Sequence, residues 1–147
     1  HGKRSVDSIH KELGHIMWEH VGMGRTAEGL KEGLEKIKAI RKEFDTNLFI
    51  PGDKEGLNVE LDKAIHLRDF ITMGELIAYD ALSRNESCGG HFREEYQTEE
   101  GEAKRDDEHY FYVGCWEYQG SDEKAPELLK EPLEYEAIKV QTRNYKN

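Results

Sequence analysis

The feature that most constrains the fold is the segment from Asn58 to about Ser83, where apolar residues fall on most sides of a helix. Asn58 is a suitable N-cap for that helix. A helix that is apolar on most sides is buried on most sides. We therefore expect other elements, from this chain or from a neighbour, to cover it. Its apolar residues are Leu61, Ala64, Ile65, Leu67, Phe70, Ile71, Met73, Leu76, Ile77, Ala81 and Leu82.

Two earlier apolar stripes predict two more helices. From Ser5 to about Val21 the apolar residues recur at steps of three and four, with Ser5 as the expected N-cap and Gly22 as the expected stop. From Thr26 to about Phe44 a second stripe lies beneath a face of Glu, Lys and Arg, and Thr26 is the expected cap. These stripes favour a bundle with the third helix.

Two features are expected to tighten this bundle. Gly29 and Gly33 on the second helix have a spacing that would let two helices approach closely. Residues 45–56 contain Pro51-Gly52-Asp53 and are predicted to form a loop. Within that loop, the apolar residues 48–50 are expected to pack down on the bundle as a lid.

The last part of the chain, residues 87–147, holds little that could form a core of its own. Residues 109–118 are aromatic and β-prone, and we expect them to pack on a partner surface. Residues 126–132 indicate a turn-rich connector with a short helix at 127–130. Residues 134–145 alternate loosely and predict a final extended strand.

These elements predict a mainly α fold. Residues 1–86 form a three-helix bundle (spectrin-repeat-like), and residues 87–147 form a charged loop and an extended C-terminal tail with one or two short β-strands, which packs on the bundle and on missing domains. The acidic charge is uneven, with 13 Lys and Arg against 16 Asp and Glu in the first part and 8 against 15 in the second. An acidic chain without a basic stripe disfavours nucleic acid and anionic membrane surfaces as partners, and neither is expected.

Metal and disulfide chemistry is not favoured by the sequence. Cys88 and Cys115 are the only cysteines and have no CxxC spacing, so two reduced thiols are expected rather than a disulfide. His10, His15 and His20 are five residues apart, and at about 100° per residue they point away from one another around a helix. We interpret them as surface or interface histidines rather than metal ligands.

Two further motifs have simple structural interpretations. Residues 22–27 match the dinucleotide pattern GxGxxA, but they follow a helix instead of a strand, so we predict a tight interhelical turn. Arg68, Asp69, Glu75 and Asp80 on the third helix are interpreted as surface or interface charges, because no nucleophile converges on them.

Residues 86–109 carry the densest polar chemistry, including two glycines at Gly89-Gly90. Arg93 and Arg105 can each fork onto a carboxylate, and paired Asp106 and Asp107 can accept several backbone N–H bonds. This composition fits a polar latch that leans on another part of the protein. A solvated charged loop fits the same residues.

The same segment resembles a known family. The pattern Glu86-Ser87-x-Gly89-x-His91-x-Arg93-x-x-Tyr96, followed by Arg105-Asp106-Asp107-Glu108, is similar to the C-terminal signature of the flavoprotein subunit of succinate dehydrogenase and fumarate reductase, a family that includes L-aspartate oxidase. The run Met17-x-x-x-Val21-Gly22-x-x-Arg25, with Leu30 and Leu34, resembles the start of the same helical domain. The ending Thr142-Arg143-Asn144-Tyr145 also resembles the tail of that subunit, so the resemblance spans residues 17–145.

The chain departs from the family pattern at several positions. Cys88 stands where the family usually has Arg, Gly90 where it has a small residue such as Ala, Glu95 where it has Asp, and Gln97 where it has Pro. Residues 98–104 are an insertion that the family mostly lacks. Cys88 is the largest change, because loss of a guanidinium removes five hydrogen-bond donors.

The resemblance implies the C-terminal region of an oxidoreductase that interconverts succinate and fumarate by hydride transfer. Such a subunit binds FAD, usually through a covalent histidine link, and passes electrons to an iron–sulfur subunit and then to quinone. The implied partners are the flavin-binding and capping domains of the same subunit, the iron–sulfur subunit and, indirectly, a membrane anchor subunit. The implied location is cytoplasmic, peripheral to the inner membrane through these subunits.

The catalytic and flavin-binding segments of the family precede this region, so no catalytic, cofactor-binding or metal role is expected for any residue here, and this chain alone should be inactive. The resemblance implies a structural docking network for the other domains at five residues, some of which should be left unpaired in the chain alone. These residues are His91, Arg93, Arg105, Asp106 and Asp107.

Two other functions stay open. One is a freestanding acidic adaptor whose helices offer a groove to partner helices. The other is a small helical enzyme that uses His and Glu as metal ligands. Because the chain begins HGKRSVD, we expect a processed product or a piece of a longer protein. The residues do not distinguish succinate oxidation from fumarate reduction, and the long tail after Asp107 disfavours L-aspartate oxidase.

Overall fold

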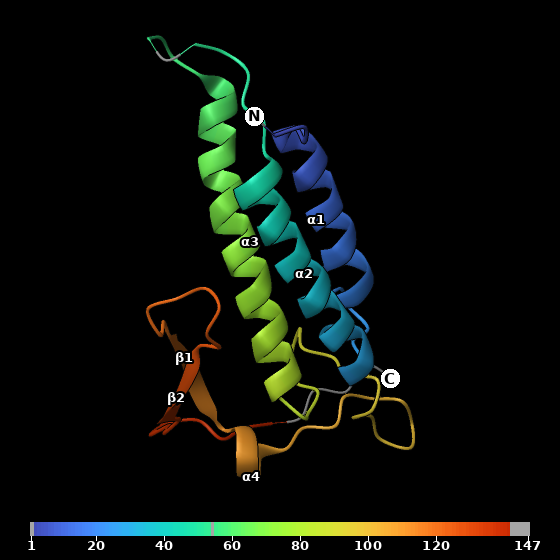
Figure 1. The fold of residues 1–147 in the computed structure, drawn as a ribbon. Helices are drawn as coiled ribbons and strands as arrows, with labels where there is room; N and C mark the ends of the chain where they lie inside the picture. Colours follow the sequence, from blue (N-terminus) through green and yellow to red (C-terminus); the bar gives the residue numbers. More distant parts are fainter. Residues whose placement is uncertain (1, 54, 142–147) are drawn as a thin grey trace.

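The computed structural model describes residues 2–53 and 55–141. Three helices, α1 (Val6–His20), α2 (Ala27–Asn47) and α3 (Val59–Ser83), run side by side as an elongated bundle (Figure 1). A short helix α4 (Asp107–Tyr110) and a hairpin of β1 (Tyr112–Glu117) and β2 (Glu127–Pro132) lie at one end of it. The predicted bundle with a tail and two short strands is confirmed.

All three bundle helices begin at the caps expected from the sequence. The side chains of Ser5, Thr26 and Asn58 each accept a hydrogen bond from a backbone N–H in the first turn of their helix. Such bonds satisfy donors that have no partner inside the helix. The second helix continues to Asn47, three residues past the predicted end at Phe44.

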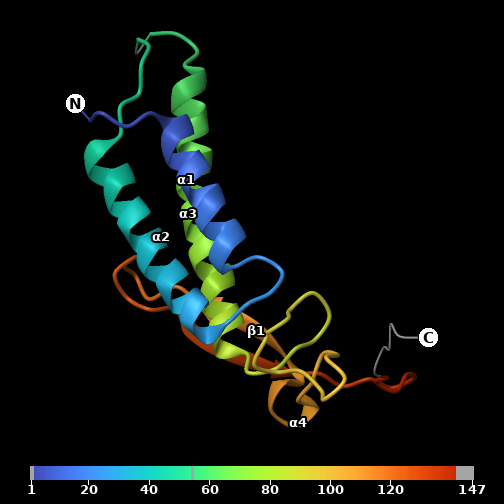
Figure 2. The ribbon, with the colours of Figure 1, turned by 90° about the vertical axis from the view of Figure 1, so that its right-hand side faces the viewer.

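The core lies between the three helices and is made by the predicted stripes. In Figure 2 the bundle is seen from the side, with α2 next to both other helices over most of its length. Every buried apolar residue of the cluster comes from one of the three helices or from Val21 directly after α1. These residues are Val6, Ile9, Leu13, Ile16, Val21, Leu30, Leu34, Ile37, Ile40, Ala64, Leu67, Ile71, Ala78 and Ala81.

One of the two glycines expected to allow close helix approach does so. A Cβ atom on Gly33 would lie 2.8 Å from the Cβ of His20, so α2 meets the end of α1 at this glycine. Gly29 was predicted wrongly, since a Cβ there would meet only Thr26 of its own helix cap. In the predicted lid, Leu48 and Ile50 pack against the core, whereas Phe49 is exposed.

The tail packs on α3 through its hairpin. β1 and β2 are antiparallel, with Tyr112 opposite Pro132 and Glu117 opposite Glu127. The indole Nε1 of Trp116 donates to Asp80 at 3.1 Å, and its ring lies 6.3 Å from that of Tyr79. The aromatic segment expected to face a partner therefore buries part of its surface on this chain.

Two predictions for the tail were wrong. The helix expected at residues 127–130 is part of strand β2, because pairing with β1 overrides the weak local helix preference. Within the expected strand of residues 134–145, the described part, residues 134–141, pairs with no strand. Residues 142–145, with the Thr-Arg-Asn-Tyr ending, lie outside the described residues.

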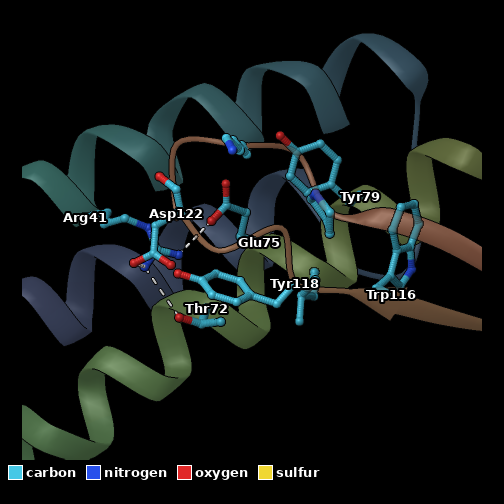
Figure 3. A pocket seen from close by; sticks show the side chains of 11 residues that line it. Arg41, Thr72, Glu75, Tyr79, Trp116, Tyr118 and Asp122 are labelled. Atoms are coloured by element: carbon cyan, nitrogen blue, oxygen red, sulfur yellow. Dashed lines mark hydrogen bonds and ion pairs between the residues drawn. The ribbon is translucent and has the colours of Figure 1, made fainter.

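The interior also holds an ion pair that the sequence did not reveal. Arg41 of α2 donates from Nη2 to Glu75 of α3 at 2.6 Å, and both side chains are nearly buried. Arg41 also reaches Thr72 and, at 3.4 Å, Asp122 in the hairpin loop, beside a cavity of about 270 Å³ (Figure 3). Glu75, expected as a surface or interface charge, is therefore an internal contact between two helices.

The thiols of Cys88 and Cys115 are both free, as predicted. Among the described residues, no helix is long and apolar enough to cross a membrane.

Candidate docking site at the helix ends

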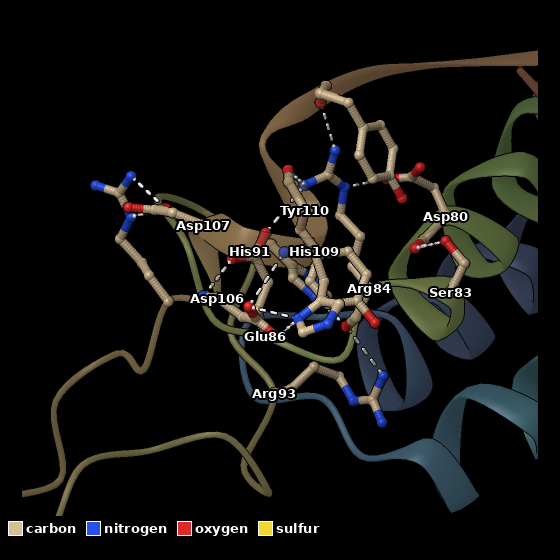
Figure 4. Close-up of polar contacts among 12 residues, drawn as sticks. Asp80, Ser83, Arg84, Glu86, His91, Arg93, Asp106, Asp107, His109 and Tyr110 are labelled. Atoms are coloured by element: carbon tan, nitrogen blue, oxygen red, sulfur yellow. Dashed lines mark hydrogen bonds and ion pairs between the residues drawn. The ribbon is translucent and has the colours of Figure 1, made fainter. Parts of the chain in front are cut away.

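The side chain of Arg93 lies buried against the C-terminal end of α3 (Figure 4). Its Nη1 donates to the carbonyl oxygens of Ala81, Leu82 and Arg84 at 3.1, 3.3 and 3.4 Å. The last carbonyl groups of a helix have no partner inside it, and a cation there also interacts favourably with the helix dipole. Arg93 therefore closes the end of α3 from a position in the following loop.

The same guanidinium is joined to the start of α2 through Glu95. Arg93 Nε donates to Glu95 Oε2 at 3.1 Å, while Glu95 Oε1 accepts the backbone N–H of Ala27, the first residue of α2. Burial alone would favour the neutral carboxyl, but the hydrogen bonds from Ala27 and Arg93 outweigh it and lower the pKa of Glu95. A carboxylate at a helix N-terminus and a cation at a C-terminus are the favourable arrangement at both ends.

Backbone bonds hold this loop in place. Arg25 N donates to Phe92 O at 3.1 Å, and Glu94 N donates to Arg25 O at 2.8 Å, so the loop pairs with the α1–α2 linker. The buried hydroxyl of Ser87 accepts from Arg93 N at 2.9 Å and donates to Arg93 O at 3.1 Å. The linker predicted as a tight turn thus binds the backbone of the loop that contains Arg93.

His91 lies between this linker and the end of α3. Its Nδ1 is 2.8 Å from Nη1 of Arg25, and its Nε2 is 3.0 Å from the carbonyl oxygen of Arg84. Since a guanidinium can only donate, these partners assign a neutral ring with the proton on Nε2. Burial, assisted by the charges of Arg25 and Arg93, lowers the pKa of His91 despite the carbonyl contact.

Arg25 in turn closes the end of α1. Its Nε donates to the carbonyl oxygens of Val21 and Gly22 at 3.1 and 3.2 Å. One network therefore holds three helix ends: Arg25 on α1, Glu95 on α2 and Arg93 on α3. At each end, the side chain binds backbone groups that the helix itself leaves unpaired.

Two glycines allow the loop to turn beside His91. Cys88 and His91 exchange backbone hydrogen bonds of 2.8 and 3.0 Å, which closes a two-residue turn at Gly89 and Gly90. Gly89 has a φ of 58°, a conformation that glycine adopts without the steric cost of a side chain. The turn needs the glycine rather than any particular side chain at position 88.

The other predicted residues form a second, outer cluster. The buried carboxylate of Glu86 accepts from Arg84 Nη1 and from the backbone N–H of Asp106, both at 3.0 Å. Arg84 also donates to the carbonyl oxygens of Tyr110 and Tyr112, which ties α4 and β1 to the end of α3. Glu86 and Arg84 thus connect the inner cluster to Asp106.

Asp106 and Asp107 pair with neighbours on the outer face. Asp106 caps α4, and its carboxylate lies 2.9 Å from Nδ1 of His109, an interaction that lowers the pKa of Asp106 and raises that of His109. Arg105 donates from Nη2 to Asp107 at 2.6 Å and from Nη1 to the carbonyl oxygen of Gln141 at 3.2 Å. Arg105 therefore holds the tail against the loop.

The structure brings the five predicted residues into one polar region, in two linked groups. The expectation that some of them would be unpaired is wrong, because each has a partner within the described chain: helix-end carbonyl groups for His91 and Arg93, and near neighbours for Arg105, Asp106 and Asp107. Sequence reasoning did not include Arg25, Arg84, Glu86, Ser87 and Glu95 in the network. Arg25, Glu86, Ser87 and Glu95 were visible as positions of the family pattern, whereas Arg84 gave no signal.

Chemically, this arrangement immobilises backbone groups at the helix ends. Its donors and acceptors are used on helix ends, and among the described residues no group of three His, Cys, Asp or Glu side chains could hold a metal ion. The Gly-rich linker follows helix α1 and its backbone pairs with the loop, so it does not form a phosphate-binding turn.

The fold and the site define a class: a helical domain whose charged loop and hairpin fasten the ends of a three-helix bundle. The chain belongs to the family described as "Fumarate reductase flavoprotein C-term", which it matches over residues 10–145. That family is one of flavoprotein oxidoreductases of the fumarate reductase and succinate dehydrogenase type, and the chain corresponds to its C-terminal domain.

Several relatives carry names from this family. The chain is 32% identical over 95 residues to an uncharacterised FAD-dependent oxidoreductase of Methanocaldococcus jannaschii, covering 65% of this chain and 16% of that protein. It is 37% identical to a chloroplastic L-aspartate oxidase of Oryza sativa over 64% of this chain and 14% of that one. It is 25% identical to the fumarate reductase flavoprotein subunit of Helicobacter pylori over 95% of this chain and 18% of the subunit.

Solved structures share the fold. A quinol–fumarate reductase with menaquinol molecules superposes with a TM-score of 0.78 at 24% identity, over 94% of this chain and 23% of the other. The Sdh1 complex of Mycobacterium smegmatis gives a TM-score of 0.74 at 23% identity, over 90% of this chain and 21% of the other. The chain thus spans less than a quarter of each of these proteins.

Proposed function

We propose that this chain is the supporting C-terminal domain of a flavoprotein subunit that interconverts succinate and fumarate and transfers electrons to an iron–sulfur subunit and quinone. The match to the family over residues 10–145 is the observation that carries the proposal. The curated relatives are much longer, since the chain spans 14% to 18% of those described above. Residues 1–86 act as the bundle, and residues 87–147 as the part that packs on the bundle and on the other domains.

In this proposal the outer cluster is the docking surface. The inner residues His91 and Arg93 fix the loop, because their polar atoms are used on helix ends. Arg105, Asp106 and Asp107 lie on the outside of the same loop, where partly exposed charges can meet the flavin-binding and capping domains. The iron–sulfur subunit lies near this end, and a membrane anchor subunit is reached only through it.

FAD belongs to the preceding domains of the full-length subunit. When bound there, the flavin supplies the hydride acceptor or donor, and this chain contributes shape and stability to its surroundings. The assembled subunit is cytoplasmic and peripheral to the inner membrane through its partners.

The experiment is a comparison of full-length subunits that carry Arg105→Gln or no substitution. Two quantities are measured: the flavin retained by the subunit, and the amount of its complex with the iron–sulfur subunit recovered from size-exclusion chromatography. We expect Arg105→Gln to lower one or the other by at least a factor of five. The melting temperature of the isolated chain should barely change, because among the described residues Arg105 pairs with Asp107 and Gln141 near the surface.

Lys31→Gln, on the exposed face of α2, is the matched control and should leave both measurements unchanged. Equal flavin content and equal assembly in Arg105→Gln and Lys31→Gln would refute the docking role. An active isolated chain, or a gene that encodes no flavin-binding domain with this one, would refute the proposal as a whole.

A further inference from the structure

Helix α3 exposes an apolar ridge along the side that faces away from α1 and α2. Leu61, Ile65, Met73 and Ile77 are spaced by multiples of four residues and are 42% to 58% exposed. Residues four apart are neighbours on a helix surface, and such rows, which wind slowly around the helix, are the ridges that pack into grooves of a neighbouring element. Isolated exposed apolar residues are ordinary, but an aligned row marks an interaction surface.

The buried face of α3 is already complete without this ridge. Ala64, Leu67, Ile71 and Ala78 face the bundle and are at most 3% exposed. The helix is therefore apolar on two sides, of which the bundle covers one. This is the physical reason why its sequence lacks the single stripe seen in α1 and α2.

The other elements of the chain leave most of the ridge open. The hairpin reaches α3 at Tyr79 and Asp80 through Trp116, close to its C-terminal end. The hairpin loop also lies beside Thr72, Glu75 and Leu76, so the hairpin and its loop flank the C-terminal half of α3, whereas the N-terminal half lies at an edge of the bundle (Figure 1). Toward α1, Phe70 has one aromatic neighbour, the ring of His10 at 5.5 Å.

One charge interrupts the ridge. Asp69 occupies the position between Ile65 and Met73 in the four-residue row, it is exposed, and it makes no hydrogen bond or ion pair with another residue of the described chain. A carboxylate covered by an apolar partner without a cation would be strongly unfavourable. Whatever covers the ridge must therefore bring a positive side chain opposite Asp69.

We propose that this ridge is the docking surface for the larger part of the same flavoprotein polypeptide, with an apolar surface that carries one Lys or Arg opposite Asp69. The inference rests on the proposed function. The relatives supply the argument for this occupant, since the chain is equivalent to less than a fifth of each curated protein described above, so most of the polypeptide lies outside it. The occupant packs along α3, next to the hairpin.

Thiol labelling tests the proposal directly. Ile65→Cys and Met73→Cys are made singly in a background with Cys88→Ala and Cys115→Ser, both in the isolated chain and in the full-length subunit. Glu35→Cys is the control, because Glu35 lies on the exposed face of α2 with a side chain 75% exposed. The rate of reaction with a water-soluble maleimide is measured at each site.

We expect all three sites to react at similar rates in the isolated chain. In the full-length subunit the rates at positions 65 and 73 should fall at least tenfold, while the rate at position 35 stays the same. Unchanged labelling at 65 and 73 in the subunit would overturn the inference. Protection that appears in the isolated chain and grows with its concentration would assign the ridge to a second copy and also overturn it.

A second variant keeps the test independent of labelling chemistry. Asp69→Lys should reduce the melting temperature of the full-length subunit but not that of the isolated chain, where residue 69 is solvated. An equal effect in both would contradict a partner cation at this place. If the ridge stays accessible while Arg105→Gln still impairs assembly, this inference fails and the proposed function stands.

Discussion

The guanidinium Nε of Arg93 lies 3.1 Å from the carboxylate of Glu95, and this pair joins the C-terminal end of α3 to the N-terminal end of α2. Arg93 is buried, whereas the Glu95 side chain is 39% exposed. Each partner also binds backbone groups that its helix leaves free. The pair therefore stabilises the fold through two helix ends as well as through its own charges.

Replacement of Arg93 should be among the most damaging changes to this chain. Arg93→Met leaves the carbonyl groups at the end of α3 and the carboxylate of Glu95 without a donor, so we expect a loss of about 3 kcal/mol in the free energy of unfolding. Urea denaturation followed by circular dichroism measures it. Arg105→Met, the surface control, should cost less than about 1 kcal/mol. Equal losses for the two would contradict the assigned role of Arg93.

Glu95→Gln should separate the hydrogen bond of the carboxylate from its charge. The amide oxygen can still accept from Ala27 N, but the favourable charge at the start of α2 is lost, so we expect about 0.5–1 kcal/mol of destabilisation. Glu95→Ala removes both and should cost about 1–2 kcal/mol. The same denaturation experiment gives both values, and a larger effect for Gln than for Ala would be inconsistent with capping.

The pKa values of His91 and His109 should be shifted in opposite directions. Burial and the neighbouring arginines lower the pKa of His91, while Asp106 raises that of His109, so the two should bracket the ordinary value of about 6.5. Two-dimensional NMR of the imidazole C–H groups reports both pKa values. In Asp106→Asn the value of His109 should fall back toward the ordinary one, and that of His91 should stay where it was.

The lowered pKa of His91 has a consequence for stability. Because its folded pKa lies below its unfolded one, the unfolded chain binds the additional proton first, and the contribution of neutral His91 is lost as the pH falls from about 6.5. Unfolding free energies at pH 7.5 and pH 5.5 should therefore differ less in His91→Gln than in the unmodified chain. An identical difference in both would show that His91 is not the responsible group.

The internal pair of Arg41 and Glu75 should show strong coupling. Arg41→Met leaves a nearly buried carboxylate unpaired, so it should cost about 3–5 kcal/mol. Glu75→Met leaves the guanidinium with only the longer contacts to Asp122 and Thr72 among the described residues, so it should cost less. The double substitution should cost less than the sum of the two, because no charge is left alone. A double-mutant cycle in urea measures this, and additive losses would contradict the coupling.

Gly33 should be intolerant of a side chain. Gly33→Ala places a methyl group 2.8 Å from the Cβ of His20, which is attached to the backbone of α1 and cannot move away easily, so we expect about 1–3 kcal/mol of destabilisation. Gly14→Ala is the matched control in α1, where a Cβ would meet no atom within 4 Å. It should stabilise the chain by up to about 1 kcal/mol in thermal or urea denaturation.

Local pattern was sufficient for the bundle. Caps at Ser5, Thr26 and Asn58 and apolar steps of three and four residues depend only on nearby sequence, so the three helices could be predicted. The site was predicted only in part. Arg93 was visible as a cation in a motif, but its partners at Ala81 and Leu82 are backbone groups, which carry no residue-type signal.

The sequence by itself determined the helices, their buried faces and the family, because periodicity, caps and irregular motifs depend on residues that lie close together in the sequence. Only the tertiary structure decided that residues 127–130 form a strand, that Glu75 is internal, and that Arg25, Glu95 and Arg93 fasten three helix ends. These outcomes depend on contacts between segments far apart in the chain, and such contacts override weak local preferences. They also use backbone groups that every residue shares.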